Sequence, residues 1–278
     1  MGGKTRRLIV IVLMIAGIVV MIYPALSNYI NRIHSSRAVQ ELSRRLENTD
    51  PGALEQQRAL AEEYNEALSG GSPEPEKNGD ILTQYDRILD FGNGVMGSIS
   101  IPKIGVELSV YHGVSDTVLQ KGVGHVPKSA FPIGGAGNHC VLTGHTGLPS
   151  AELFSNLTKL TEGDVFYLQV LGQTLGYAVD RITVVLPHET QQLGPVPDRD
   201  CCTLVTCTPY GINSHRLLVR GQRIRLDPAE EALVETAHGE AEISVPVELI
   251  LAGGAVAVLL TAALAVLLRR EPGEEGAP

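Results

Sequence analysis

Three residues carry side chains suited to acyl transfer: Cys207, His145 and Arg216. Cys207 follows an apolar run and precedes the turn-forming sequence Thr-Pro-Tyr-Gly, so we expect an accessible thiol at a strand end. His145 follows another apolar run and could give a proton to a leaving amine. Arg216 has five N–H donors and a permanent charge, which favour a thiolate and stabilise an oxyanion. Taken singly, such a cysteine is more often a core residue and such a histidine a surface or structural one, and the arginine could simply pair with an aspartate.

The elements around Cys207 explain how these residues could meet. Residues 203–206 are predicted to form a strand that runs into Cys207, and a second strand is predicted to begin near His215 after a turn. If the two strands pair, the chain reversal returns Arg216 to the side of Cys207.

From Val95 onward the sequence consists of short runs rich in Val, Ile, Leu and Thr, separated by Gly, Pro and Asp. Many short strands with few helices predict a mainly β fold, closed into a barrel. The clearest helix within this region is expected over residues 150–160, with Ser150 as its N-cap.

A helical extension is expected before the barrel. Residues 28–69 repeat leucines at helical spacing, and the sequence Asp50-Pro51-Gly52 interrupts them, which predicts two helices. A polar turn-rich loop follows over residues 70–80, and residues 81–89 are expected to form one more short helix.

Two apolar segments are expected to cross a membrane. Residues 8–26 contain no charge, and residues 249–268 have Thr261 as their one polar side chain. Basic residues flank the outer ends of both segments, which predicts cytoplasmic termini and an extracellular central region. A signal peptide cleaved near Ala25 is the alternative for the first segment, and a buried soluble helix is the alternative for the second.

The bulk composition excludes some functions. The net charge is −9 and the chain has no dense basic block away from the apolar segments, so we expect no nucleic-acid partner. A zinc site from His139, Cys140 and the pair Cys201/Cys202 has the wrong ligand spacing, so we expect no metal and no cofactor. Cys140 and Cys202 are predicted to be small buried residues.

Two sequence blocks resemble the motifs of class C, pilin-polymerising sortases: TGHTGLPSAELFSNL and TLVTCTPYGINSHRLLVRG. The resemblance is dense over about residues 92–226. It matches the family's catalytic histidine, nucleophile and arginine to His145, Cys207 and Arg216, and it selects Arg216 over Arg220. It implies a closed eight-stranded barrel with short helices, and anchors at both ends of the chain.

The resemblance also implies a reaction and its partners. Cys207 would cleave the Thr–Gly bond of an LPXTG-like sorting signal on a pilin or surface protein, and a pilin lysine or a lipid-linked cell-wall precursor would accept the acyl group. Class C members commonly carry an Asp-Pro-aromatic lid, whereas the corresponding residues here are Ser72, Pro73 and Glu74. A different wall thiol hydrolase and a non-catalytic surface scaffold remain the alternatives. The chain is expected to have five parts. Residues 1–27 form a tip and the first membrane helix, residues 28–91 the extension with its lid, and residues 92–226 the catalytic barrel. Residues 227–248 form an acidic linker, and residues 249–278 the second membrane helix with its tail.

Overall fold

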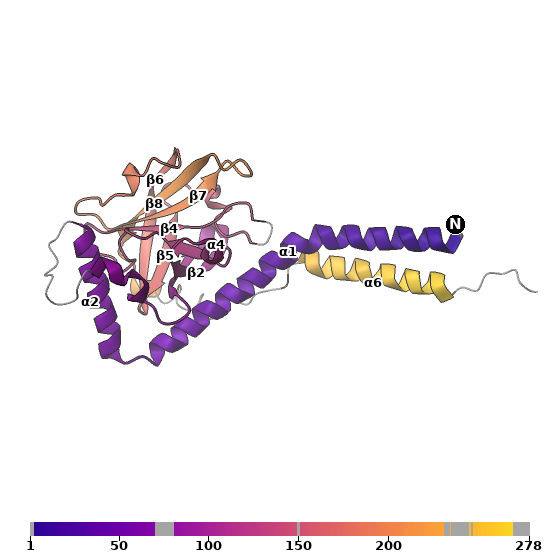
Figure 1. Cartoon of the computed structure of the whole chain (residues 1–278), viewed down its shortest axis with the longest axis horizontal. Coiled ribbons are helices and arrows are strands. Elements are labelled where there is room, and N and C mark those ends of the chain that lie inside the picture. Colours follow the sequence, from indigo (N-terminus) through magenta and orange to yellow (C-terminus); the bar gives the residue numbers. More distant parts are fainter. Residues whose placement is uncertain are drawn as a thin grey trace, which may run out of the picture. The chain divides into compact units, whose positions relative to one another are not determined.

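The computed structural model describes residues 3–69, 81–148, 151–230, 234, 245 and 247–268. The chain separates into two compact units, one formed by Met1–Ile30 with Ile243–Pro278 and the other by Asn31–Glu242. The second unit contains the strands of the β-barrel (Figure 1). The acidic linker expected over residues 227–248 falls largely outside the described residues.

Two long helices precede the barrel, as the sequence predicted. Helix α1 spans Gly3–Glu47 and helix α2 spans Pro51–Leu68. The break occurs because the Asp50 carboxylate accepts a hydrogen bond from the backbone N–H of Ala53 at 3.2 Å and starts a new helix, with proline at its first position. The short helix expected next is the 3-10 helix η1, Ile81–Arg87.

The two apolar segments lie in helices with described apolar stretches of different length. Among the described residues, one helix is long and apolar enough to cross a membrane, Thr5–Glu47 within α1. Helix α6 spans Val247–Leu268, and its described apolar stretch covers Leu249–Ala265. The second membrane crossing therefore has weaker support than the first.

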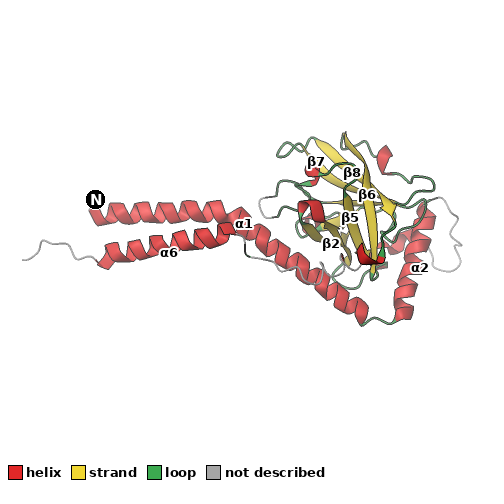
Figure 2. Ribbon diagram, turned by 180° about the vertical axis from the view of Figure 1, so that it is seen from behind, coloured by secondary structure: helices red, strands yellow, loops and turns green. Residues whose placement is uncertain are grey.

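The strands close into the expected eight-stranded barrel, in the order β1-β2-β3-β4-β7-β8-β6-β5 (Figures 1 and 2). The pairs β2–β3 and β4–β7 are parallel, and the other neighbours are antiparallel. The strands are β1 Val95–Ile101, β2 Val106–His112, β3 Val123–His125, β4 His139–Thr143, β5 Val165–Val170, β6 Gln173–Val185, β7 Cys201–Thr208 and β8 His215–Ile224.

The hairpin between β5 and β6 shows how local sequence sets the register. Leu171 and Gly172 both have positive φ, 53° and 71°, which is the geometry of a two-residue turn that matches the twist of the paired strands. Val170 consequently pairs with Gln173. Along β5, partly exposed and buried side chains alternate, so every second residue enters the barrel core.

The second half of α1 is tied to the outside of the barrel by Ser35. Its hydroxyl accepts a hydrogen bond from the backbone N–H of Ser109 at 3.0 Å and donates to the carbonyl of Glu107 at 3.4 Å. Ser109 in turn donates from its own hydroxyl to the carbonyl of Ser35 at 3.3 Å. These bonds satisfy the edge of β2 where no strand covers it.

The prediction of a helix over residues 150–160 is wrong. Leu153 has a φ of 39°, which no α-helix accommodates, and the N–H of Phe154 donates to the distant carbonyl of His145 at 3.1 Å. Turns and one 3-10 helix take the place of the α-helix, and the proposed cap Ser150 lies outside the described residues. The short helices of the domain are η2 Pro102–Ile104, α4 Asp116–Leu119, η3 Leu157–Lys159 and η4 Gln191–Leu193.

Candidate active site

Cys207 lies one residue before the end of β7, directly opposite Arg216 near the start of β8. Paired residues of antiparallel strands have their side chains on the same face, close enough to interact. Both residues are partly exposed, so the thiol and the guanidinium reach solvent. The predicted pairing of these two strands, which returns Arg216 to the side of Cys207, is therefore confirmed.

Two arginines of β8 have different partners. Arg216 donates from Nη1 to the backbone carbonyls of Asn213 at 3.2 Å and His215 at 3.1 Å. Arg220 instead donates two charge-assisted hydrogen bonds to the carboxylate of Asp180, of 2.9 and 2.6 Å. Within the described part of the chain, Arg216 has no carboxylate partner, so its remaining donors are available to a ligand.

His145 and Cys207 occupy equivalent positions along two parallel strands, β4 and β7. The last paired residues of β4 and β7 are Thr143 and Val205, and each candidate lies two residues further along its strand direction. Both residues are partly exposed. The parallel pairing therefore directs the two side-chain positions to the same end of the barrel.

Hydrogen bonds fix the chain immediately before both residues. The N–H of Gly144 donates to the carbonyl of Val205 at 3.1 Å. The buried hydroxyl of Thr206 donates to the carbonyl of Gly144 at 2.7 Å. Thr206, which the sequence did not single out, thus joins the residue before Cys207 to the residue before His145.

The loops that follow the two strands also touch. Gly147 has a φ of 74°, and a Cβ atom on it would lie 3.1 Å from a ring carbon of Tyr210. The N–H of Gly147 donates to the hydroxyl of Ser155 at 2.9 Å. Glycine therefore allows Tyr210, which is 73% exposed, to lie against the His145 loop. The sequence features that mark this contact are Gly147, two residues after His145, and Tyr210, three residues after Cys207.

The zinc ligands considered from the sequence do not converge. His139 donates from Nδ1 to the carbonyl of Gly194 and accepts at Nε2 from the hydroxyl of Thr203, each at 2.7 Å, while Cys140 belongs to the barrel core on the other face of β4. Burial lowers the pKa of His139, although the hydrogen bond to Gly194 opposes that effect. Among the residues that the structure describes, no group of three or more His, Cys, Asp or Glu is placed to hold a metal ion.

The lid residues Ser72, Pro73 and Glu74 lie outside the described residues, so the lid stays a prediction. The helix that follows them is anchored, because the Tyr85 hydroxyl donates to the carbonyl of His125 at 3.0 Å and accepts from the N–H of Gly113 at 2.9 Å.

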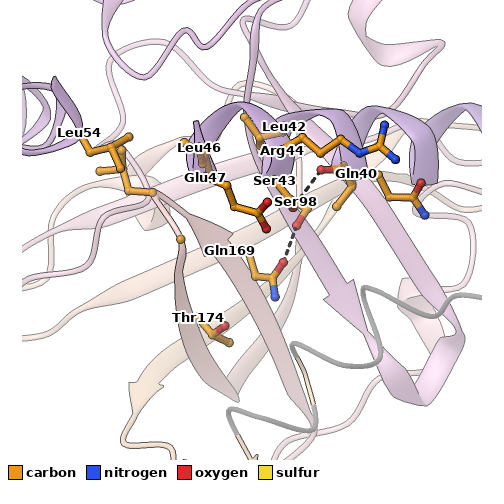
Figure 3. A pocket seen from close by; sticks show the side chains of 13 residues that line it. Gln40, Leu42, Ser43, Arg44, Leu46, Glu47, Leu54, Ser98, Gln169 and Thr174 are labelled. Carbon is orange, nitrogen blue, oxygen red and sulfur yellow. Dashed lines mark hydrogen bonds between the residues drawn. The ribbon is translucent and has the colours of Figure 1, made fainter. Parts of the chain in front are cut away.

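A pocket of about 780 Å³ lies away from the three candidates, between the end of α1 and strands β1 and β5 (Figure 3). Ser98 and Gln169 lie at its wall, with a long hydrogen bond of 3.4 Å between them. The β5–β6 turn also lines it, and that turn is at the barrel end opposite Cys207. We therefore assign it no part in the chemistry.

Comparison with known proteins identifies the family. Residues 99–224 match the family model described as Sortase domain. The structure resembles sortase C1 from Streptococcus agalactiae with a TM-score of 0.64 and 42% identity, over 69% of this chain and 100% of that chain. It also resembles sortase C-1 from Actinomyces oris with a TM-score of 0.58 and 46% identity, over 63% of this chain and 100% of that chain.

Curated relatives agree over a shorter range. Sortase A of Bacillus anthracis is 32% identical over 130 residues, which are 47% of this chain and 60% of that protein. The match to sortase A of Streptococcus agalactiae covers 47% of that protein, so the chain spans about half the length of the curated relatives it matches. Because it covers the whole of two solved sortase structures at more than 40% identity, the chain belongs to the sortase family of cysteine transpeptidases.

Proposed function

We propose that this protein is a membrane-anchored cysteine transpeptidase that cleaves an LPXTG-like sorting signal and transfers the acyl group to an amine. The observation that carries the proposal is the direct pairing of Cys207 with Arg216, whose guanidinium is held by backbone carbonyls rather than by a carboxylate. A thiol beside a permanent cation favours the reactive thiolate.

In the first step, the Cys207 sulfur attacks the threonine carbonyl carbon of the sorting signal. Arg216 donates hydrogen bonds to the resulting oxyanion, an interaction that typically contributes ~3–4 kcal/mol to the transition state. His145 gives its proton to the glycine nitrogen as the C–N bond breaks. The products are a thioester on Cys207 and a released peptide whose first residue is glycine with a free amino group.

In the second step, the amino group of the acceptor attacks the thioester carbonyl. His145, now neutral, takes the proton that the attacking amine loses, and Arg216 again stabilises the oxyanion. The C–S bond breaks, a new amide forms, and Cys207 returns to its thiolate state.

An apolar cluster beside the cysteine supports a peptide substrate. Val205 lies two residues before Cys207 on the same face of β7, and it pairs with Leu218 of β8. Both pack with Val141 and Val185 in one cluster, separate from the barrel core. The branched and cyclic side chains of a Leu-Pro sequence are chemically compatible with such a surface.

We place the protein with the class C, pilin-polymerising sortases. The support is the sequence resemblance over the two motif blocks and the similarity to the solved structures of sortase C1 and of a pilus-related sortase C of Group B Streptococcus. The expected acyl donors are pilin or surface proteins with the sorting signal. The expected acceptors are a pilin lysine or a lipid-linked cell-wall precursor.

We further propose that both ends of the chain cross the membrane, with cytoplasmic termini and an extracellular barrel. The support is the uncharged segment at residues 8–26, the apolar segment at residues 249–268 and the basic residues at their outer ends. Fusing alkaline phosphatase, which is active only outside the cytoplasm, to each terminus in turn tests this topology. Activity from either fusion would contradict it.

Covalent labelling separates the proposed function from its alternatives. The full chain in detergent is treated with a sorting-signal peptide whose scissile carbonyl is replaced by a thiol-reactive group. We expect the adduct on Cys207, its loss in Cys207→Ala, and its retention in Cys201→Ala as the matched control. A scaffold would give no adduct that depends on the peptide sequence. A thiol hydrolase of another type would cleave the natural peptide without forming a new amide with an added amine.

A further inference from the structure

Two cysteines outside the proposed site lie opposite each other in the barrel core. Cys140 on β4 pairs directly with Cys202 on the parallel strand β7. They are 3% and 0% exposed, and both belong to the main core cluster, so both side chains point into the barrel. Cys201, one residue earlier on β7, is also buried but is absent from that cluster.

The strand pairing brings the two residues within the range of a disulfide. Neighbouring strands lie about 4.8 Å apart, so paired residues have Cα atoms at about that separation. Disulfides bridge Cα atoms that are about 4.4–6.8 Å apart, provided that the Cβ atoms point the same way. Cys140 and Cys202, whose thiols are both free in this structure, are paired neighbours with side chains on the same face of the sheet, so they fall within this range.

The two thiols of the pair also differ in reactivity. Burial opposes ionisation of the Cys140 thiol, but hydrogen bonds from Cys202 and His125 outweigh burial and lower its pKa. Burial and the neighbouring Cys140 raise the pKa of Cys202. One sulfur is therefore the better nucleophile of the two, as thiol–disulfide exchange requires.

We propose that Cys140 and Cys202 form a disulfide that links the two strands leading to His145 and Cys207. The oxidant is an organic disulfide, such as that of a thiol–disulfide oxidoreductase, acting before the barrel closes over the two thiols. The Cys140 thiolate attacks this disulfide and forms a mixed disulfide, and one oxidant sulfur leaves as a thiol. The Cys202 sulfur, losing its proton, then displaces the other oxidant sulfur, so that two thiols are oxidised and one disulfide is reduced.

The position of this cross-link connects it to the active site. Cys140 precedes His145 by five residues (145 − 140), and Cys202 precedes Cys207 by five residues (207 − 202). The bond would hold β4 and β7 in the register that brings His145 and Cys207 to one end of the barrel. It would also close a loop of 62 residues (202 − 140), which restricts the unfolded chain.

The test uses the full chain in detergent with Cys207→Ala throughout, so that the exposed thiol cannot exchange. The protein is equilibrated in mixtures of oxidised and reduced glutathione, at a urea concentration that permits local opening, and free thiols are then blocked with N-ethylmaleimide. Mass spectrometry of tryptic peptides identifies the linked residues. We expect a Cys140–Cys202 link that persists in Cys201→Ala and disappears in Cys202→Ala.

Thermal unfolding gives a second readout that does not depend on catalysis. Because the link restricts the unfolded chain, we expect the oxidised form to melt at least about 5 °C above the reduced form, with no such difference in Cys140→Ala. The proposal is overturned if no linked peptide forms, if the link joins Cys201, or if oxidation leaves the melting temperature unchanged. Peptide labelling of the reduced protein with Cys207 intact reports separately on the transpeptidase proposal.

Discussion

Exchanging each arginine of β8 for lysine should separate catalysis from stability. Arg216 uses one nitrogen for two backbone carbonyls, at 3.2 and 3.1 Å, and keeps its other donors for an oxyanion. Lysine retains the charge but not the planar fork. Losing one oxyanion donor typically lowers kcat about 10²–10³-fold, which corresponds to ~2.7–4 kcal/mol. We therefore expect Arg216→Lys to lower kcat/KM about a hundredfold or more, with a melting temperature within about 2 °C of the wild type.

Arg220→Lys is the matched control, on the same strand and with the same change of side chain. Arg220 is 13% exposed and holds both oxygens of Asp180, whose side chain is 23% exposed. An ammonium can replace one of these charge-assisted bonds, so the loss of the other should cost about 1.5–3 kcal/mol. For a domain of this size that cost lowers the melting temperature by roughly 3–12 °C. We expect kcat/KM to stay within about threefold of the wild-type value.

The assay follows cleavage of a fluorogenic sorting-signal peptide by the full chain in detergent, with an added amine as acceptor, and differential scanning calorimetry on the same samples. The reasoning requires opposite patterns in the two variants. If Arg220→Lys loses activity while Arg216→Lys keeps it, the arginine has been assigned wrongly. If neither variant loses activity, electrostatic stabilisation by β8 is refuted altogether.

Three further predictions concern the support of the site. Thr206→Val leaves the carbonyl of Gly144 without its 2.7 Å bond and should lower the free energy of unfolding by about 1–3 kcal/mol in urea titrations; a loss below about 0.5 kcal/mol would show that the bond contributes little. Gly147→Ala places a side chain at a φ of 74° and should lower the free energy of unfolding by about 1–2 kcal/mol. Adding Tyr210→Ala to this variant should restore only the part of that loss that comes from the 3.1 Å contact. Burial lowers the pKa of His139, so the unfolded state binds a proton more readily, and stability should fall as the pH drops below about 6.5. His139→Gln should reduce the difference in melting temperature between pH 7 and pH 5, and an unchanged difference would exclude His139 as its source.

Much of the fold could be predicted from local sequence because the deciding interactions are local. The helix break at Asp50 depends on a cap and a proline within four residues. The β5–β6 turn depends on two adjacent residues, and the alternation along each strand follows from burial of one face. The pairing of β7 with β8 follows from the short turn between them, which is why Arg216 could be placed beside Cys207 in advance.

Other features depend on contacts between distant residues and could not be read from sequence spacing. Residues 150–160 have a local pattern that is typical of a helix, but the N–H of Phe154 donates to the carbonyl of His145, which lies outside the segment. Thr206 and Gly144 are 62 residues apart, and the contact of Tyr210 with Gly147 spans a similar separation. Each of these contacts supports the site, and each requires the closed barrel before it exists.

Strand direction explains why these three residues lie at the same end of the barrel. β4 and β7 are parallel, so His145, which follows β4, and Cys207, near the carboxyl end of β7, lie at the same end of the barrel, while β8 is antiparallel and brings Arg216 to that end near its start. The arrangement therefore depends on register more than on loop conformation. A slip of β8 by one residue would place His215 or Leu217 opposite Cys207 and move Arg216 to the other face of the sheet. The hydrogen bond of Thr206 and the proposed disulfide would both act on the neighbouring pair β4–β7, where the same slip would separate His145 from Cys207.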